Sequence, residues 1–301
     1  MCSIRYSGSD KSVSESVDCG FPSLAPAPPP AAFTCDAVLV SYPKCGRTWL
    51  RLMIGQTFIL HFGLANANPF YPSALALQSQ VVPSVILSHD NSNYLQEVGP
   101  IYCSEERYRH TKVIFLVRDP RDVIVSRYFH RTKRNRDYSE ELSDFLREPV
   151  GGFDHLITFY NVWAESQHVP KGFLLVHYED LHQNAHQELR RVMDFLGLTT
   201  ISDAVLAEVV KGTTFCEMRK MEEEDRFDTF QLRPADRDDK ESYKTRRGQI
   251  GGFRDYVSAA DLSELEQKMQ NLSPIFGYSP IHGDNPSPLH RTDLTPSSEK
   301  A

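Results

Sequence analysis

Lys44, Gly46 and Thr48 lie in one short stretch whose residue types suit the binding of an anion. The stretch follows an apolar run at 38–40, which predicts a buried strand, and it leads into a segment with apolar residues at helical spacing. A strand, a tight glycine-containing turn and a helix start would direct backbone N–H groups and the positive end of the helix at one point. Lys44 would add a positive charge there and Thr48 a hydroxyl donor. We therefore predict a phosphate or sulfate site.

The order of residues in this stretch differs from that of the common loop that binds nucleoside triphosphates. That motif is G-x-x-x-x-G-K-[ST], whose hydroxyl holds magnesium, whereas Lys44 precedes Gly46 by two residues. The sequence Y-P-K-C-G-R-T-W at 42–49 resembles instead the 5′-phosphosulfate loop, Y-P-K-S-G-T-T-W, of the sulfotransferases that use 3′-phosphoadenosine 5′-phosphosulfate (PAPS). Cys45 replaces the usual serine and Arg47 the first threonine. Taken alone, the stretch could also be an ordinary strand-to-helix corner.

Two further segments are similar to motifs of the same family. R-D-P-R-D-V-I-V-S at 118–126 resembles its 3′-phosphate segment, R-N-P-K-D-x-x-x-S, in which the arginine can bind a phosphate through two N–H groups and the serine donates from the following helix. R-R-G-Q-I-G-G-F-R at 246–254 resembles its R-K-G-x-x-G-D-W-K signature. Singly, these could be a solvated charge and a flexible basic loop. Three matches in the family's order, over most of the chain, favour the family.

The resemblance also implies which residues bind the donor. Aromatic side chains would hold the adenine, namely Trp49, Tyr178 in Y-E-D, and Phe215 in the segment T-T-F-C-E-M, although each could equally belong to the core. The implied donor-binding residues are Lys44, Cys45, Gly46, Arg47, Thr48, Trp49, Arg118, Ser126, Tyr178, Thr213, Phe215, Arg246, Arg247 and Gly248. Because Cys45 would sit at a helix start beside Lys44, we expect its thiolate to be favoured and its modification to be blocked by the donor.

Transfer of a sulfuryl group is an in-line displacement that depends on positioning and on stabilising charge at the leaving oxygen. We assign that stabilising role to Lys44, and the resemblance implies that Ser126 tethers this lysine until substrate binds. His89 is the candidate base, since an imidazole with an unperturbed pKa of ~6.5 accepts protons near neutral pH. The family places K-T-H where this chain has L-S-H, so its lysine is missing. With 11 histidines in the chain, His89 could instead be structural.

The composition limits the other classes of function. The chain of 301 residues has 33 basic and 40 acidic side chains, a net charge of −7 that gives no general affinity for nucleic acid. Its 6 cysteines show no C-x-x-C pair and no metal-ligand spacing, which predicts reduced thiols, a cytoplasmic protein and no metal. Since we find neither an apolar run of membrane-spanning length nor a signal peptide, we expect no membrane partner.

Apolar runs at 38–40, 85–87, 112–117 and 173–178 alternate with helical patterns. This alternation predicts an α/β fold with a mostly parallel, doubly wound sheet, helices on both faces and the phosphate-binding strand-loop-helix. The domain is expected at 33–282, between a disordered Ser/Pro/Ala-rich leader at 1–32 and a disordered tail at 283–301. Asp119 should cap a helix that begins at Pro120.

Two charged segments are expected at the surface. The acid-rich segment 222–245 predicts an exposed loop, and the basic run 127–136 predicts a solvated helix face, with docking of a polyanionic acceptor as the alternative. The family's dimer motif, K-x-x-x-T-V-x-x-x-E, is not recovered after Phe253, so the oligomeric state stays open.

The function expected from these features is transfer of a sulfonate group from PAPS to a hydroxyl or amine of a small acceptor. Two alternatives stand beside it. The first is an atypical nucleotide kinase, which would need a magnesium-binding carboxylate near Lys44. The second is a nucleotide-binding regulator without catalysis, which the altered residues beside His89 and in the first loop allow.

Overall fold

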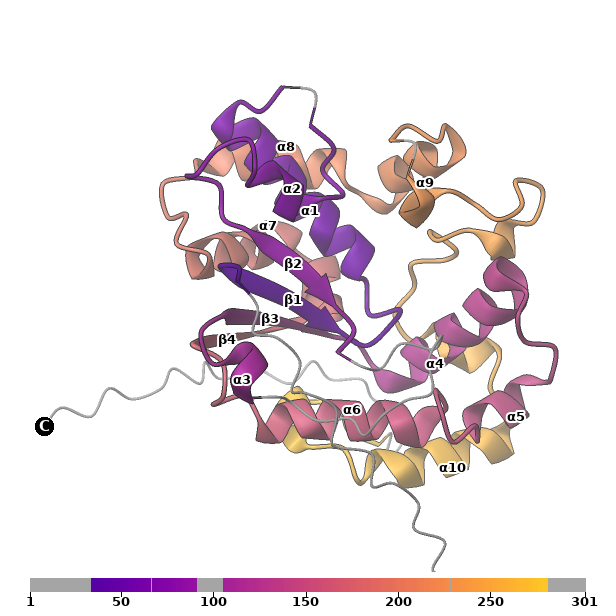
Figure 1. Cartoon of the computed structure of the whole chain (residues 1–301). Helices are drawn as coiled ribbons and strands as arrows, with labels where there is room; N and C mark the ends of the chain where they lie inside the picture. The colour runs from indigo at the N-terminus through magenta and orange to yellow at the C-terminus, as the bar shows by residue number, and fades with distance from the viewer. Residues whose placement is uncertain (1–33, 66, 91–104, 228, 281–301) are drawn as a thin grey trace, which may run out of the picture.

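Figure 1 shows the computed structural model of the chain, which describes residues 34–65, 67–90, 105–227 and 229–280. The leader predicted at 1–32 and the tail predicted at 283–301 lie outside the described residues.

Four parallel strands form the sheet, in the spatial order β2-β1-β3-β4. They are β1 (Ala37–Ser41), β2 (Val85–Ser88), β3 (Lys112–Val117) and β4 (Gly172–His177). Every residue of β1 is buried, as is all of β3 after its first residue, which is the pattern of parallel strands covered on both faces. The strands predicted from apolar runs are confirmed to within a residue or two at each end. The last one ends before Tyr178, because that residue begins a helix.

Helices cover both faces of this sheet (Figure 1). One face carries α1 (Arg47–Phe62), α2 (Pro72–Leu75), α7 (Tyr178–Phe195) and α8 (Asp203–Gly212), and the other carries α3 (Glu105–Tyr108), α6 (Phe153–Glu165) and α10 (Ala259–Met269). Beyond the carboxyl edge lie α4 (Pro120–Phe129), α5 (Leu142–Leu146) and α9 (Phe215–Glu223). The predicted α/β fold is confirmed. In the described part of the chain, no helix combines the length and the apolar character that a bilayer crossing needs.

The chain leaves β1 and β3 toward opposite sides of the sheet. From β1 it passes through α1 to β2 at one edge, and from β3 it passes through α4 and α6 to β4 at the other. In open parallel sheets, ligands bind outside the carboxyl ends of the strands at such a switch point. The loop with Lys44 follows β1 and Arg118 follows β3, so both predicted anion-binding residues emerge there.

Aromatic packing between the sheet and α6 fixes the end of β3. Phe115 stacks on Trp163 with 5.3 Å between ring centroids and packs against Tyr160 at 6.1 Å. All three rings are fully buried, and each such ring contributes roughly 1.5–3 kcal/mol by leaving water. The Tyr160 hydroxyl donates to the carbonyl of Arg118 at 2.9 Å and accepts from its backbone N–H at 3.0 Å. The core thus holds the backbone of Arg118 directly.

Helix α4 begins as predicted. The Asp119 side chain accepts from the backbone N–H of Arg121 at 2.9 Å, and Pro120 is the first helical residue. After Phe129 the helix continues as a π-helix, η1 (His130–Asn135). The expectation that the basic run 127–136 is a solvated face is wrong for two of its arginines. Arg127 is 1% exposed and donates to the Tyr42 hydroxyl, and the Arg134 side chain is 8% exposed. Both cationic side chains are therefore largely buried, and Arg134 pairs with the Glu222 carboxylate at 3.4 Å.

The segment 222–245 is also more structured than predicted. It begins in α9 and contains the 3₁₀ turns η2 (Phe230–Leu232) and η3 (Lys240–Ser242), while η4 (Gly252–Asp255) and η5 (Pro274–Phe276) follow it. Glu222 and Ser242 are fully buried, so the expectation of a wholly exposed loop was wrong. The reason is that the Glu222 carboxylate is satisfied from within the segment, which allows an acidic side chain to be buried.

Candidate active site

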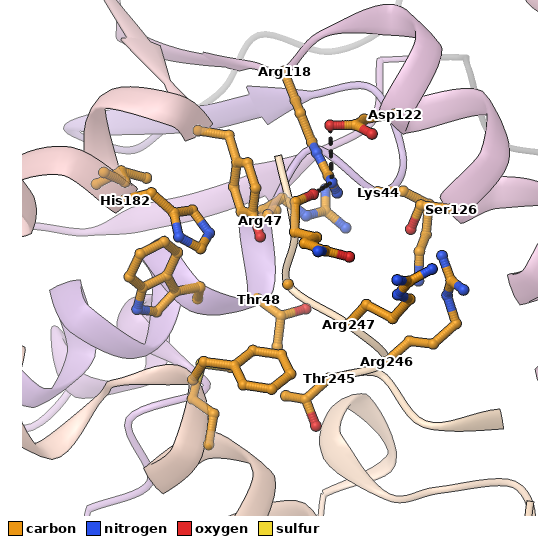
Figure 2. A pocket seen from close by; sticks show the side chains of 18 of the residues that line it. Lys44, Arg47, Thr48, Arg118, Asp122, Ser126, His182, Thr245, Arg246 and Arg247 are labelled. Atoms are coloured by element: carbon orange, nitrogen blue, oxygen red, sulfur yellow. Dashed lines mark hydrogen bonds and ion pairs between the residues drawn. The ribbon is translucent and has the colours of Figure 1, made fainter. Parts of the chain in front are cut away.

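A cavity of about 580 Å³ opens at the carboxyl edge of β1 and β3, a size typical of small-ligand sites. Figure 2 shows that it is built from separate stretches of the chain, with Lys44 and Thr48 from the first motif, Arg118 and Ser126 from the second, and Arg246 and Arg247 from the third. The structure therefore brings the three sequence motifs together around one cavity.

The loop that contains Lys44 requires a glycine at position 46. Both Lys44, with φ 80°, and Gly46, with φ 96°, lie in the left-handed region, and Gly46 precedes the first residue of α1. A side chain at Gly46 would place its Cβ 2.5 Å from Cδ2 of Tyr178. The Tyr178 ring in turn lies 5.9 Å from that of Trp49, edge to face. Glycine at this position therefore allows an aromatic ring to pack directly on the anion-binding loop.

Lys44 stands in positively charged surroundings. Burial lowers its pKa well below the usual value, and the neighbouring cations Lys244 and Arg134 lower it further, while the carboxylate of Glu222 opposes them. A desolvated ammonium group among other cations gains most from a bound anion. The positive charge around Lys44 is therefore consistent with the anion site that the motif predicts.

Arg118 joins the second motif to the third. Its Nη2 donates to the carbonyl of Gln249 at 2.7 Å and pairs with the Asp122 carboxylate at 3.4 Å (Figure 2). Asp122 accepts from the backbone N–H groups of Gly251 at 2.7 Å and Phe253 at 3.0 Å. The buried Nε of Arg118 has no hydrogen-bond partner within the described residues. A donor is therefore left for a ligand.

The two arginines of the third motif share one hydroxyl. Arg246 and Arg247 donate to the Tyr256 hydroxyl at 2.8 and 2.9 Å, and Figure 2 shows their side chains together on the side of the cavity where Ser126 lies. Gly248, with φ 62°, follows them, and a Cβ there would lie 2.4 Å from the Phe215 ring. The backbone of the motif and the predicted adenine-stacking ring are thus in direct contact.

His89 reaches the same cavity from the end of β2. Its Nδ1 lies 2.7 Å from the carbonyl oxygen of Ser41 and so donates to it, which leaves Nε2 as the unprotonated nitrogen. Burial lowers the pKa of His89 well below its usual value, and Arg47 and Lys244 add to the effect. The imidazole is therefore neutral near pH 7 and able to accept a proton.

Comparison with known proteins decides the family. A model described as "Sulfotransferase domain" matches residues 34–273. The chain belongs to the sulfotransferase family. Human sulfotransferase 2A1 is 23% identical over 250 residues, covering 78% of this chain and 83% of the relative, and cytosolic sulfotransferase 12 of Arabidopsis thaliana is 24% identical over 265 residues, covering 78% and 76%. The crystal structure of mouse sulfotransferase SULT7A1 complexed with PAP has the same fold, with a TM-score of 0.57, 24% identity, and coverage of 81% and 88%.

The predicted family and enzyme class are thereby confirmed. This sulfotransferase transfers a sulfonate group from PAPS to a small acceptor. In the described part of the chain, no group of three or more His, Cys, Asp or Glu side chains is arranged to hold a metal ion.

Two residues of the sulfotransferase that were predicted to bind the donor, Cys45 and Thr213, do not line the cavity. The Cys45 thiol lies in the core, 3.2 Å from the Tyr160 hydroxyl, and burial raises its pKa to about 12. The expectation of a favoured thiolate was therefore wrong, because desolvation outweighs the neighbouring charges. The Thr213 hydroxyl donates to the carbonyl of Val209 at 2.8 Å inside α8, whereas the neighbouring Thr214 lines the cavity.

Sequence reasoning missed several residues that line the cavity of the sulfotransferase. Among them are Lys244 and Thr245, directly before the third motif, His130 at the start of η1 and His182 in α7. The His182 ring lies 4.9 Å from that of Trp49. For Lys244 and Thr245 the available signal was their position beside Arg246, but the acid-rich segment before them suggested a solvated loop.

Proposed function

We propose that the three motifs bind the two ends of one PAPS molecule and that the sulfonate moves to a hydroxyl or amine of a small acceptor. In this proposal Lys44, Thr48 and the loop N–H groups bind the 5′-phosphosulfate end. The 3′-phosphate is bound by Arg118, Ser126, Arg246 and Arg247. The observation that carries the proposal is that residues from three distant stretches line one cavity at the switch point of the sheet.

The chemistry of the cavity supports a ligand with several negative charges. The chain as a whole is acidic, with a net charge of −7, yet lysine and arginine side chains gather around this cavity. The buried Nε of Arg118 offers a donor, and Gly46 and Gly248 leave room for Tyr178 and Phe215 at the backbone. Trp49, Tyr178 and Phe215 line the same cavity and would flank a flat base.

In the proposed mechanism, Nε2 of His89 accepts the proton of the acceptor as the new sulfur–oxygen or sulfur–nitrogen bond forms. The bond between the sulfur and the bridging oxygen breaks, and Lys44 stabilises the negative charge that develops on the departing 5′-phosphate. The proton thus ends on His89 and the electron pair on the phosphate. The neutral state of His89 supports this assignment, because it makes Nε2 available as an acceptor. The tether between Ser126 and Lys44 stays a prediction.

The location and the partners belong to the proposal as well. A cytoplasmic enzyme agrees with relatives that are named cytosolic sulfotransferases, and we propose a small molecule, not a nucleic acid or a membrane surface, as the partner. A retinol dehydratase of the same fold, at 16% identity, a TM-score of 0.53 and coverage of 78% of this chain and 80% of that one, is described in complex with retinol and PAP. Its ligand is an example of a small hydroxyl compound.

A transfer assay tests the proposed function. Sulfonate-labelled PAPS is incubated with the enzyme and with a panel of phenols, alcohols, sugars and amines, and the labelled products are separated. We expect label on at least one class of acceptor and none with Lys44→Met, whose folding is checked by its melting temperature. If the wild type binds PAP but labels no acceptor in the panel, the result would contradict the proposed transfer and favour a regulator without catalysis.

A further inference from the structure

Lys244 is a cavity residue to which the motifs assign no role. Its backbone is fixed by Glu222, a fully buried carboxylate near the end of α9. Glu222 accepts from the backbone N–H of Lys244 at 2.6 Å, and from the N–H and the hydroxyl of Thr245 at 2.9 and 2.6 Å. Three hydrogen bonds to one carboxylate hold this short segment in place. Lys244 therefore lines the cavity from a segment whose backbone is held by Glu222.

Lys244 is surrounded mainly by other cations. Burial lowers its pKa to about 7, and Arg134 from η1 and Arg47 and Arg51 from α1 act in the same direction, while Glu222 opposes them. An anion bound beside this side chain would reverse the effect and keep the lysine charged. The position thus has the properties of an anion site whose ligand the protein itself does not supply.

The charge of Lys244 also acts on the two groups that the mechanism uses. It contributes to lowering the pKa of Lys44 and that of His89, and all three side chains line the same cavity. Lys44 is assigned to the leaving oxygen and His89 to the acceptor, so the group in transfer must lie between them. Lys244 is a third side chain within electrostatic reach of both.

Resting on the proposed function, we propose that Lys244 binds the oxygens of the transferable sulfonate group of PAPS. The sequence L-S-H at 87–89 has no lysine, whereas the family motif K-T-H has one at its first position. In this chain a cation reaches the cavity from a different segment, after α9. Lys244 is thereby a further catalytic residue, because it contacts the reacting group and can stabilise charge on it during transfer.

PAP and PAPS provide a direct test, because PAP lacks the sulfonate. Binding of each nucleotide is measured by titration calorimetry with the wild type, Lys244→Gln and Lys244→Arg. Lys240→Gln is the matched control, since Lys240 is an exposed lysine four residues earlier. We expect Lys244→Gln to weaken PAPS binding on the order of tenfold, the size of one charge-assisted hydrogen bond, and to leave PAP binding within about twofold. Lys244→Arg and Lys240→Gln should keep the wild-type preference for PAPS.

The outcomes separate this inference from the proposed function. Equal weakening of both nucleotides would place Lys244 at the phosphate and overturn the inference, and so would unchanged binding of both. In either case, PAP binding by the wild type would leave the proposed function standing. A wild type that binds neither nucleotide would instead contradict the proposed function. Melting temperatures without ligand show whether the variants fold, and because the anchor uses the backbone of Lys244, we expect them to match the wild type.

Discussion

The imidazole of His89 has its tautomer set by one backbone carbonyl. Donation from Nδ1 to the Ser41 carbonyl leaves Nε2 as the unprotonated nitrogen, and His89 lines the cavity. We therefore predict that His89→Ala lowers kcat by about 10²–10⁴-fold, the usual contribution of a general base, while the Kd for PAP stays close to the wild-type value. Steady-state kinetics with the acceptor found in the panel and calorimetry with PAP check the two parts. Turnover near the wild-type level would refute the role of His89.

Cys45 gives a second prediction, which concerns the reactivity of its buried thiol. Its thiol is buried against Tyr160 with a pKa raised to about 12, while Cys216 is exposed. Since alkylating reagents attack the thiolate, we predict that iodoacetamide modifies Cys216 in the native protein and leaves Cys45 unmodified, with or without PAP. Peptide mass spectrometry after native and denaturing treatment measures this. Rapid modification of native Cys45 that PAP prevents would contradict the buried position.

Motif spacing predicted which residues come together but not which way each side chain points. Lys44 and Arg118 could be assigned because each follows a buried strand and lies in a motif that resembles one of the family's. Cys45 and Thr213 lie within the same motifs, yet their side chains face the core and a helix backbone. That difference arises from packing against Tyr160 and from the turn at the end of α8, which a single sequence does not reveal.

In the third motif, the position of Gly248 has no room for a side chain. Gly248 has φ 62° and lies against Phe215, whereas Gly63 has φ 65° and nothing within 4 Å of an added Cβ. Both glycine-to-alanine changes should cost roughly 1–2 kcal/mol of backbone strain. We predict that Gly248→Ala also weakens PAP binding, because the new Cβ must displace Phe215 or the backbone after Arg247. Gly63→Ala is the control, because it introduces the backbone strain without a steric clash.

Thermal unfolding and PAP titration of these two variants distinguish strain from the clash. We expect a lower melting temperature in both and weaker binding in Gly248→Ala alone. Equal PAP affinity in the two variants would show that contact between Phe215 and the third motif does not matter for the site.

The elements themselves were largely predictable where local patterns agree with burial. Apolar runs marked all four strands, and Asp119 with Pro120 marked the start of α4. The acid-rich segment 222–245 was misjudged because charge usually indicates solvent. Glu222 is an exception that depends on three hydrogen bonds from residues 244 and 245, more than 20 positions away. Only the folded arrangement shows that this acid anchors a wall of the cavity.

The topology of the sheet explains why an acidic protein has a cationic cavity. The switch point between β1 and β3 places two loops side by side, and residues of the segment after α9 line the same cavity. The doubly wound arrangement was predictable from alternating strands and helices. The contact between the third motif and α4 through Asp122 was not predictable. It depends on hydrogen bonds from the backbone N–H groups of Gly251 and Phe253, which no local sequence pattern indicates.

We propose that Lys44, Arg118 and the Arg246–Arg247 pair bind a single doubly phosphorylated adenosine. Calorimetric titration of PAP into the wild type and into Lys44→Met, Arg118→Met and Arg246→Met tests it most directly, with Arg254→Met as the control, because Arg254 is an exposed arginine of the same third motif. We expect one PAP per chain, an affinity lowered about 10–100-fold in each of the three variants, and an unchanged affinity in the control. Wild-type affinity in any of the three folded variants, or tighter binding of ATP with magnesium than of PAP, would show that these side chains do not bind PAP together.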